Sequence, residues 1–171
     1  MRRLSYLVVL VLATMLGLPA TAVAAQPEII RLPIEEHIAV LEPESSLCGF
    51  PISWDYSGQL TIQVFFDADG NPTGVHVLGV TSGELSANGI TLRTQQANNR
   101  TFDFDGNTMV EMGIVSKYLL PGTGVVLMDR GRLIWNIDPE TGETVGDPVF
   151  EAGPHPSLHG DFGELCAVLT P

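Results

Sequence analysis

The sequence lacks the motifs of the common enzyme classes. It contains no G-x-S-x-G nucleophile elbow and no Walker loop, and Gly122-x-Gly124 lacks the third glycine of a dinucleotide-binding turn. It also contains no amphipathic helical stretch of ordinary length and no internal repeat of fixed length. These absences argue against a common hydrolase and against a nucleotide-dependent enzyme.

Basic residues are scarce, and Lys117 is the only lysine in the chain. Residues 26–171 carry six basic side chains against 20 acidic ones, which gives this part of the chain a net charge of −14. Such a surface repels phosphate backbones, so we expect no nucleic acid partner. Acidic charge of this size also keeps an exported protein soluble.

Only one long apolar run is present, at residues 7–18, and its 12 residues are too few to span a bilayer. The run follows the positive start Met1-Arg2-Arg3 and precedes the small residues Ala22-Val23-Ala24-Ala25. This order is typical of a cleaved signal peptide. We therefore expect residues 1–25 to be removed and the mature protein to be secreted and extracellular, with no stable membrane anchor.

Cysteine is limited to Cys48 and Cys166. In an exported protein these two thiols have one intramolecular pairing, so we expect a disulfide. Because 118 positions separate them, the bond stabilises the fold by about 4.7 kcal/mol in the chain-entropy treatment. A reactive thiol pair is the alternative, but it needs close C-x-x-C spacing and a nearby basic group, and the sequence has neither.

What the sequence does contain is apolar residues with a period of two. In residues 59–66 the even positions are apolar, which predicts a strand with one face on a core. Turn pairs such as Asn88-Gly89 and Asp105-Gly106 separate this strand from similar ones. The other predicted strands cover residues 75–80, 90–94, 102–104, 110–118, 125–128, 133–137, 145–150 and 165–169, with further turns at Asn98-Asn99, Asp129-Arg130-Gly131 and residues 138–142.

This spacing predicts an all-β antiparallel meander, arranged as a closed or partly open β-barrel, with a β-sandwich as the alternative. A bond between a cysteine that opens the sheet and one that ends it would bring the first and last strands together, as barrel closure requires. Residues 26–46 carry three prolines and predict an extended N-terminal arm with at most one edge strand. Residues 47–171 then form a single β domain closed by the disulfide.

Trp54 and Tyr56 are candidate ligand-binding residues. They lie two positions apart, so in an extended chain both side chains project from the same face. Such a pair can form a platform that stacks on a sugar ring, because an aromatic side chain combines an apolar face with a polar group. The alternative is that the pair closes one end of the core.

His155, His159 and Asp161 form the densest group of potential metal ligands. The nearby residues Gly153, Pro154, Pro156 and Gly160 restrict any helix here to about one turn. Loop side chains can still converge on a metal ion, so the three residues are a candidate metal site. Solvent-exposed or helix-capping histidines are the alternative.

Short motifs near the two cysteines and in the turns carry a resemblance. They are Cys48-Gly49-Phe50-Pro51, Gly131-Arg132-Leu133-Ile134, Asp138-Pro139-Glu140-Thr141-Gly142 and Leu165-Cys166-Ala167. With them the chain resembles uncharacterised secreted β-rich proteins of actinobacteria that have an N-terminal Cys-x-Phe-Pro and a C-terminal Cys-Ala motif. The resemblance implies export, the disulfide and β structure, and it implies no activity.

We therefore expect a secreted, non-catalytic β-barrel module that binds a small molecule or a component of the cell envelope, and no cofactor is implied. One alternative is a metal-dependent extracellular enzyme that uses His155, His159 and Asp161. The other is a structural surface protein. Thermal stability measured with and without a chelator, and then with zinc or calcium, separates the first alternative from the rest, because the absence of any shift would exclude it.

Overall fold

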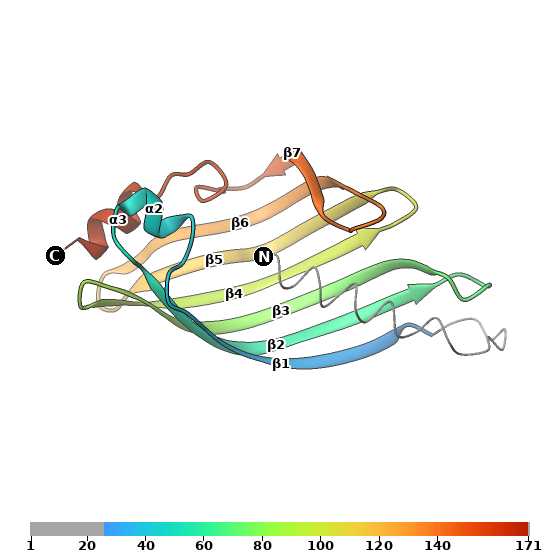
Figure 1. The fold of residues 1–171 in the computed structure, drawn as a ribbon, viewed down its shortest axis with the longest axis horizontal. Helices are drawn as coiled ribbons and strands as arrows, with labels where there is room; N and C mark the ends of the chain where they lie inside the picture. Colours follow the sequence, from blue (N-terminus) through green and yellow to red (C-terminus); the bar gives the residue numbers. More distant parts are fainter. Residues whose placement is uncertain (1–25, 171) are drawn as a thin grey trace.

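The computed structural model describes residues 26–170, so the predicted signal peptide, residues 1–25, lies outside the described residues. The chain forms one seven-stranded antiparallel sheet whose strand order follows the sequence (Figure 1). This confirms the predicted all-β antiparallel meander. The strands are β1 (Glu28–Ile38), β2 (Ser53–Phe66), β3 (Pro72–Ala87), β4 (Ile90–Asp103), β5 (Thr108–Leu120), β6 (Gly124–Ile137) and β7 (Thr144–Ala152), and the helices are α2 (Glu44–Cys48) and α3 (Gly163–Leu169).

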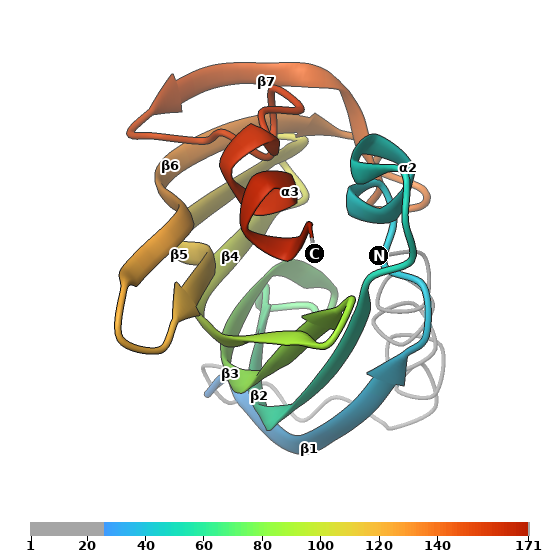
Figure 2. The same cartoon turned by 90° about the vertical axis from the view of Figure 1, so that its left-hand side faces the viewer.

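The sheet curls around α3, and α2 lies at the open side between β1 and β7 (Figure 2). We call the face that carries the helices the inner face and the opposite face the outer face. The strands at the two ends of the order, β1 and β7, are not neighbours in the sheet. Strand pairing therefore leaves the sheet open, and the closed form of the predicted barrel is not confirmed.

The inner face holds the core, because alternate residues of each strand turn toward the helices. A helix-end cluster joins Leu85 and Leu92 of the sheet to Ile52 and to Leu165 and Leu169 of α3, all fully buried. A distal cluster on the same face is centred on the branched side chains of β2 and β3, and its buried members are Ile62, Val64, Val75 and Val77. Burying apolar side chains of this size stabilises the fold by about 1.5–3 kcal/mol for each residue.

The predicted disulfide between Cys48 and Cys166 is present, with the Cα atoms 5.1 Å apart. It joins α2 to α3, and not the first strand to the last as the sequence predicted. The strand predicted for residues 165–169 is wrong, because these residues lie in α3. Leu165 and Leu169 are four positions apart, so a helix turns both onto the core.

Two of the predicted turns lie inside strands. Asn98-Asn99 is part of β4, where Asn98 Nδ2 donates a 3.0 Å hydrogen bond to Glu111 of β5. Asp129-Arg130-Gly131 is part of β6, where a Cβ at Gly131 (φ 136°) would collide with the Ala152 carbonyl oxygen of β7. Both residue types are typical of turns, but here Asn98 forms a hydrogen bond on the inner face and Gly131 allows β6 and β7 to approach closely.

Other turns are confirmed. Asn88 and Gly89 have φ angles of 52° and 80°, the left-handed pair of a tight hairpin, and they connect β3 directly to β4. The predicted N-terminal arm contains the edge strand β1, which pairs with β2 from Glu28 opposite Val64 to Ile38 opposite Trp54. Each edge strand contains a proline, Pro33 in β1 and Pro148 in β7. Within residues 26–170, none of the helices has the length and apolar character needed to cross a membrane.

Candidate functional site

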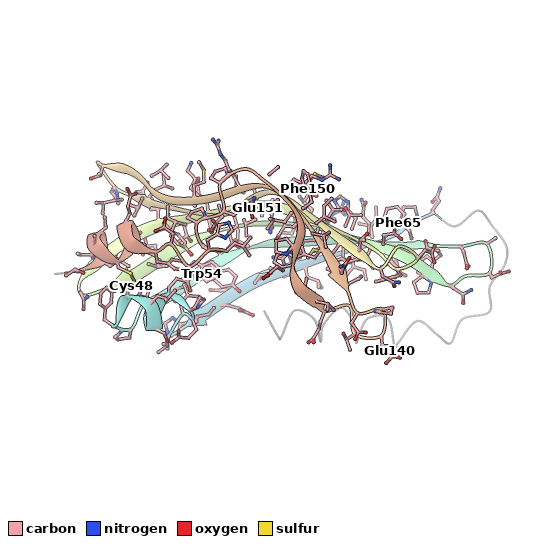
Figure 3. All side chains as sticks on the ribbon, turned by 90° about the horizontal axis from the view of Figure 1, so that it is seen from above. Cys48, Trp54, Phe65, Glu140, Phe150 and Glu151 are labelled. Atoms are coloured by element: carbon pink, nitrogen blue, oxygen red, sulfur yellow. A yellow bond between two sulfur atoms is a disulfide. The ribbon has the colours of Figure 1, made fainter. Side chains whose placement is uncertain are left out.

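Trp54 and Tyr56 lie on the inner face of β2 and stack on each other, with ring centroids 4.0 Å apart and ring planes 21° apart. The indole Nε1 of Trp54 donates a 3.0 Å hydrogen bond to Thr94 Oγ1 of β4. The Trp54 ring also packs against the helix-end cluster, and Figure 3 shows it at the end of the sheet that carries Cys48. The structure therefore brings the pair together, and it uses Trp54 within the core.

Tyr56 is half-buried, and its hydroxyl donates a 2.7 Å hydrogen bond to Glu36 Oε2 of β1. Burial raises the pKa of the Tyr56 phenol, and the hydrogen bond to Glu36 and the charge of that carboxylate raise it further. The phenol therefore stays protonated and keeps donating at physiological pH. This bond fixes the ring against β1 at the open side of the sheet.

A shallow hollow of about 510 Å³ lies over β1, β2 and β3 at the level of Tyr56. Three of its lining residues, Glu36, Tyr56 and Gly83, form a cross-strand row whose side chains belong to the inner face. The residues before and after each of them face outward, since side chains alternate along a strand. These outward polar residues are Glu35, His37, Asp55, Ser57, Ser82 and Glu84.

The outward side chains make the hollow rich in hydrogen-bond acceptors. Three of the outward side chains are carboxylates, and His37 Nδ1 lies 2.6 Å from Asp55 Oδ1. The serine hydroxyls can donate or accept. The carboxylates can therefore accept hydrogen bonds from hydroxyl or ammonium groups of a ligand, and the serine hydroxyls can donate hydrogen bonds to it.

Sequence reasoning missed this hollow because its polar residues come from three strands. The only local signal is that they occur in pairs two positions apart: Glu35 with His37, Asp55 with Ser57, and Ser82 with Glu84. Such spacing places each pair on one face of a strand, but it does not reveal the register. The pairing of His37 with Asp55, and of Asp55 with Glu84, supplies that register.

The structure does not gather His155, His159 and Asp161 into one site. His155 is buried, with Nε2 3.3 Å from the Ala152 carbonyl oxygen, while His159 is exposed and its Nε2 lies 2.9 Å from Glu151 Oε1. Asp161 is exposed. Among residues 26–170, no group of three or more His, Cys, Asp or Glu side chains has an arrangement that could hold a metal ion.

A buried polar network on the inner face was also missed. Asp129 is 3% exposed and accepts hydrogen bonds from Ser116 Oγ at 2.6 Å, from the Ser157 backbone N–H at 3.0 Å and from the Ser157 hydroxyl. These hydrogen bonds hold Ser157, in the segment after β7, against strand β6 of the sheet. The sequence concealed the network because Asp129 stands in a typical turn triplet, Asp-Arg-Gly.

Comparison of the whole chain with protein-family models, with curated proteins and with solved structures finds no significant match. The proposals that follow therefore rest on the residues and the geometry alone.

Proposed function

We propose that the protein is a secreted, non-catalytic binding module with a partly open β-barrel fold. Its ligand is a neutral or cationic polyhydroxylated molecule, such as a glycan of the cell envelope. The observation that carries this proposal is the hollow over β1, β2 and β3, to which three outward carboxylates, one imidazole and two serine hydroxyls belong. It is a shallow hollow with a volume of about 510 Å³.

The chemistry of the hollow selects the ligand class. A carboxylate has two acceptor oxygens and can take hydrogen bonds from two neighbouring hydroxyls, and bonds to an ionised acceptor are stronger than neutral ones. Asp55 and Glu84 lie directly opposite each other on β2 and β3, so one ligand can reach both. The hollow is lined by Glu35, Glu36, Asp55 and Glu84 and by no lysine or arginine, so it repels anionic polymers locally, which leaves neutral and cationic glycans.

In this proposal Trp54 and Tyr56 are positioning residues. Each ring has one face against the other ring, and both polar groups already have partners within the sheet. The Tyr56 hydroxyl bond to Glu36 joins β1 to β2 directly behind the hollow. Loss of this bond would loosen the edge strand that supplies Glu35 and His37.

The test is retention of the processed protein, purified from culture medium, on insoluble peptidoglycan stripped of anionic polymers. Asp55→Asn with Glu84→Gln removes two negative charges and keeps the side-chain shapes. We expect the affinity to fall about tenfold or more, because a hydrogen bond to a charged group contributes about 1.5–3 kcal/mol. Glu143→Gln with Asp147→Asn is the matched control, since it makes the same charge change at exposed positions, one just before β7 and one within it.

Equal retention of both double variants would contradict a site in the hollow. No retention of the wild-type protein on peptidoglycan, together with no binding of a cationic amino-sugar oligomer in calorimetry, would overturn the binding function. The structural surface protein would then be the remaining interpretation. Tyr56→Phe should weaken retention less than the loss of the two carboxylates, because it removes only the support behind the site.

A further inference from the structure

The outer face of the sheet has an unusual distribution of charge for so acidic a protein. Five of the six basic residues in the described part of the chain lie on it, and only Arg100 faces inward. Three consecutive cross-strand rows in its middle contain no Asp or Glu. The rows run from Ile29 to Phe150, from Arg31 through Arg132 to Ala152, and from Pro33 to Arg130.

These three rows form what we call the basic–apolar face. From the strand spacing they extend about 25 Å across the strands and about 14 Å along them. Large apolar side chains in the rows are exposed to solvent, with Val80 52%, Leu78 43% and Met112 38% accessible. Large exposed apolar side chains that gather on one face often mark an interaction site.

A second hollow adjoins this face where β5, β6 and the end of β7 approach one another. It has a volume of about 450 Å³, and its lining includes Ile114 and Arg130 of the basic–apolar face. The remaining lining residues are three glycines and a proline, so Arg130 is its only charged residue. The Arg130 guanidinium beside this open apolar surface can pair with an anionic group such as a phosphate.

We propose that the basic–apolar face docks the protein on the surface of an anionic lipid bilayer. Arg31, Arg130 and Arg132 pair with phosphate headgroups, and the exposed apolar side chains enter the interface between headgroups and acyl chains. A second copy of the chain fits this face poorly, because pairing two such faces brings arginines against arginines. The inference concerns a different part of the outer face from the proposed glycan site.

The experiment measures binding of the processed protein to phosphatidylglycerol–phosphatidylcholine vesicles and to vesicles of phosphatidylcholine alone. Arg130→Glu with Arg132→Glu should lower binding to the anionic vesicles at least tenfold, since each arginine near such a surface contributes about fivefold. Arg93→Glu with Lys117→Glu changes the net charge equally, but at outer-face positions beyond the three rows. This control should bind within about threefold of the wild type.

A third variant separates lipid from other anions. Leu78→Ser with Val80→Ser keeps all charges and should lower vesicle binding severalfold. Thermal unfolding of this variant is the control, and it should show an intact fold because both positions are exposed. The proposal fails if wild type does not prefer anionic vesicles, or if both charge-reversal variants lose binding equally. It also fails if the protein binds soluble polyphosphate as tightly as vesicles and the serine variant leaves vesicle binding unchanged. A concentration-dependent dimer of the wild type that the serine variant abolishes would likewise overturn it.

Discussion

Tyr118 of β5 and Glu44 of α2 meet across the interior of the curled sheet, with the tyrosine hydroxyl 3.4 Å from Glu44 Oε1. Glu44 is only 8% exposed, and its Oε2 has no hydrogen-bond partner. Burial raises the pKa of the Glu44 carboxyl, and the charges of Glu42 and Asp129 act in the same direction. The short helix is therefore docked through a carboxyl group that ionises less readily than an exposed glutamate.

Glu44→Gln should change the pH dependence of stability. Because the folded state raises the pKa of Glu44, this group stabilises the fold fully below its ordinary value of 4.5 and loses that contribution as pH rises through the folded pKa. Relative to wild type, the variant should therefore become more stable as the pH increases. Urea unfolding of both proteins at about pH 4 and about pH 7 measures the difference.

The exposed residue Glu140 at the β6–β7 loop supplies the control for this pH comparison (Figure 3). Glu140→Gln should stay within about 0.5 kcal/mol of wild type at both pH values. If Glu44→Gln shows the same small difference at both pH values, the buried carboxyl does not contribute to the pH dependence.

Asp129→Ala should destabilise the protein by about 3 kcal/mol, because it leaves the Ser116 hydroxyl and the Ser157 N–H and hydroxyl without their acceptor. Chemical unfolding gives the energy, and amide hydrogen exchange should show faster exchange in the segment after β7. Asp161→Ala is the control at an exposed carboxylate of that segment, and it should cost less than about 0.5 kcal/mol. Equal costs for the two variants would show that the network is not needed for stability.

Arg100 and Glu111 form an ion pair on the inner face, with Arg100 Nε donating to Glu111 Oε1 at 2.7 Å. Glu111 is largely buried, so Arg100→Met leaves a carboxylate with only Asn98 as partner and should cost about 3 kcal/mol. Adding Glu111→Leu should recover most of that loss, because no buried charge remains. A double-mutant cycle measures the coupling energy between Arg100 and Glu111. If the losses of the two single variants simply add, the two side chains do not stabilise each other.

Replacing both cysteines with serine should remove about 4 kcal/mol of stability, because the unfolded chain regains the freedom that a bond across 118 positions restricts. Amide exchange should accelerate first in α2 and α3, which the bond joins, and only later in the paired strands β2 to β4. Mass mapping of non-reduced peptides from the purified protein is the direct check. Free thiols at Cys48 and Cys166 in that material would contradict this account.

The fold class could be predicted because it depends on local periodicity. The alternation in β2 and the turn pairs Asn88-Gly89 and Asp105-Gly106 each act over a few residues, and the structure confirms them. The same local rules failed at Asn98 and Gly131, where a partner strand decides the conformation. They failed again at residues 165–169, because a five-residue apolar segment fits a strand and a helix equally well.

The candidate site could be predicted only in part. The spacing of Trp54 and Tyr56 correctly indicated a shared face, but it could not show that the rings stack on each other instead of presenting a platform. The carboxylates of the hollow come from β1, β2 and β3, and the register that joins them is a property of the whole sheet. The same holds for the basic–apolar face, whose residues are spread over most of the sequence.

The prolines on the two edge strands have a consequence for behaviour at high concentration. The edge strands of an open sheet have unpaired backbone groups with which strands of other copies can pair, and ordered aggregates begin in this way. Pro33 and Pro148 lack the N–H that an added strand needs, and charged residues such as Glu35 and Asp147 flank them. Strand pairing leaves both edges of the sheet open, and these residues therefore hinder the addition of further copies that would build a fibre.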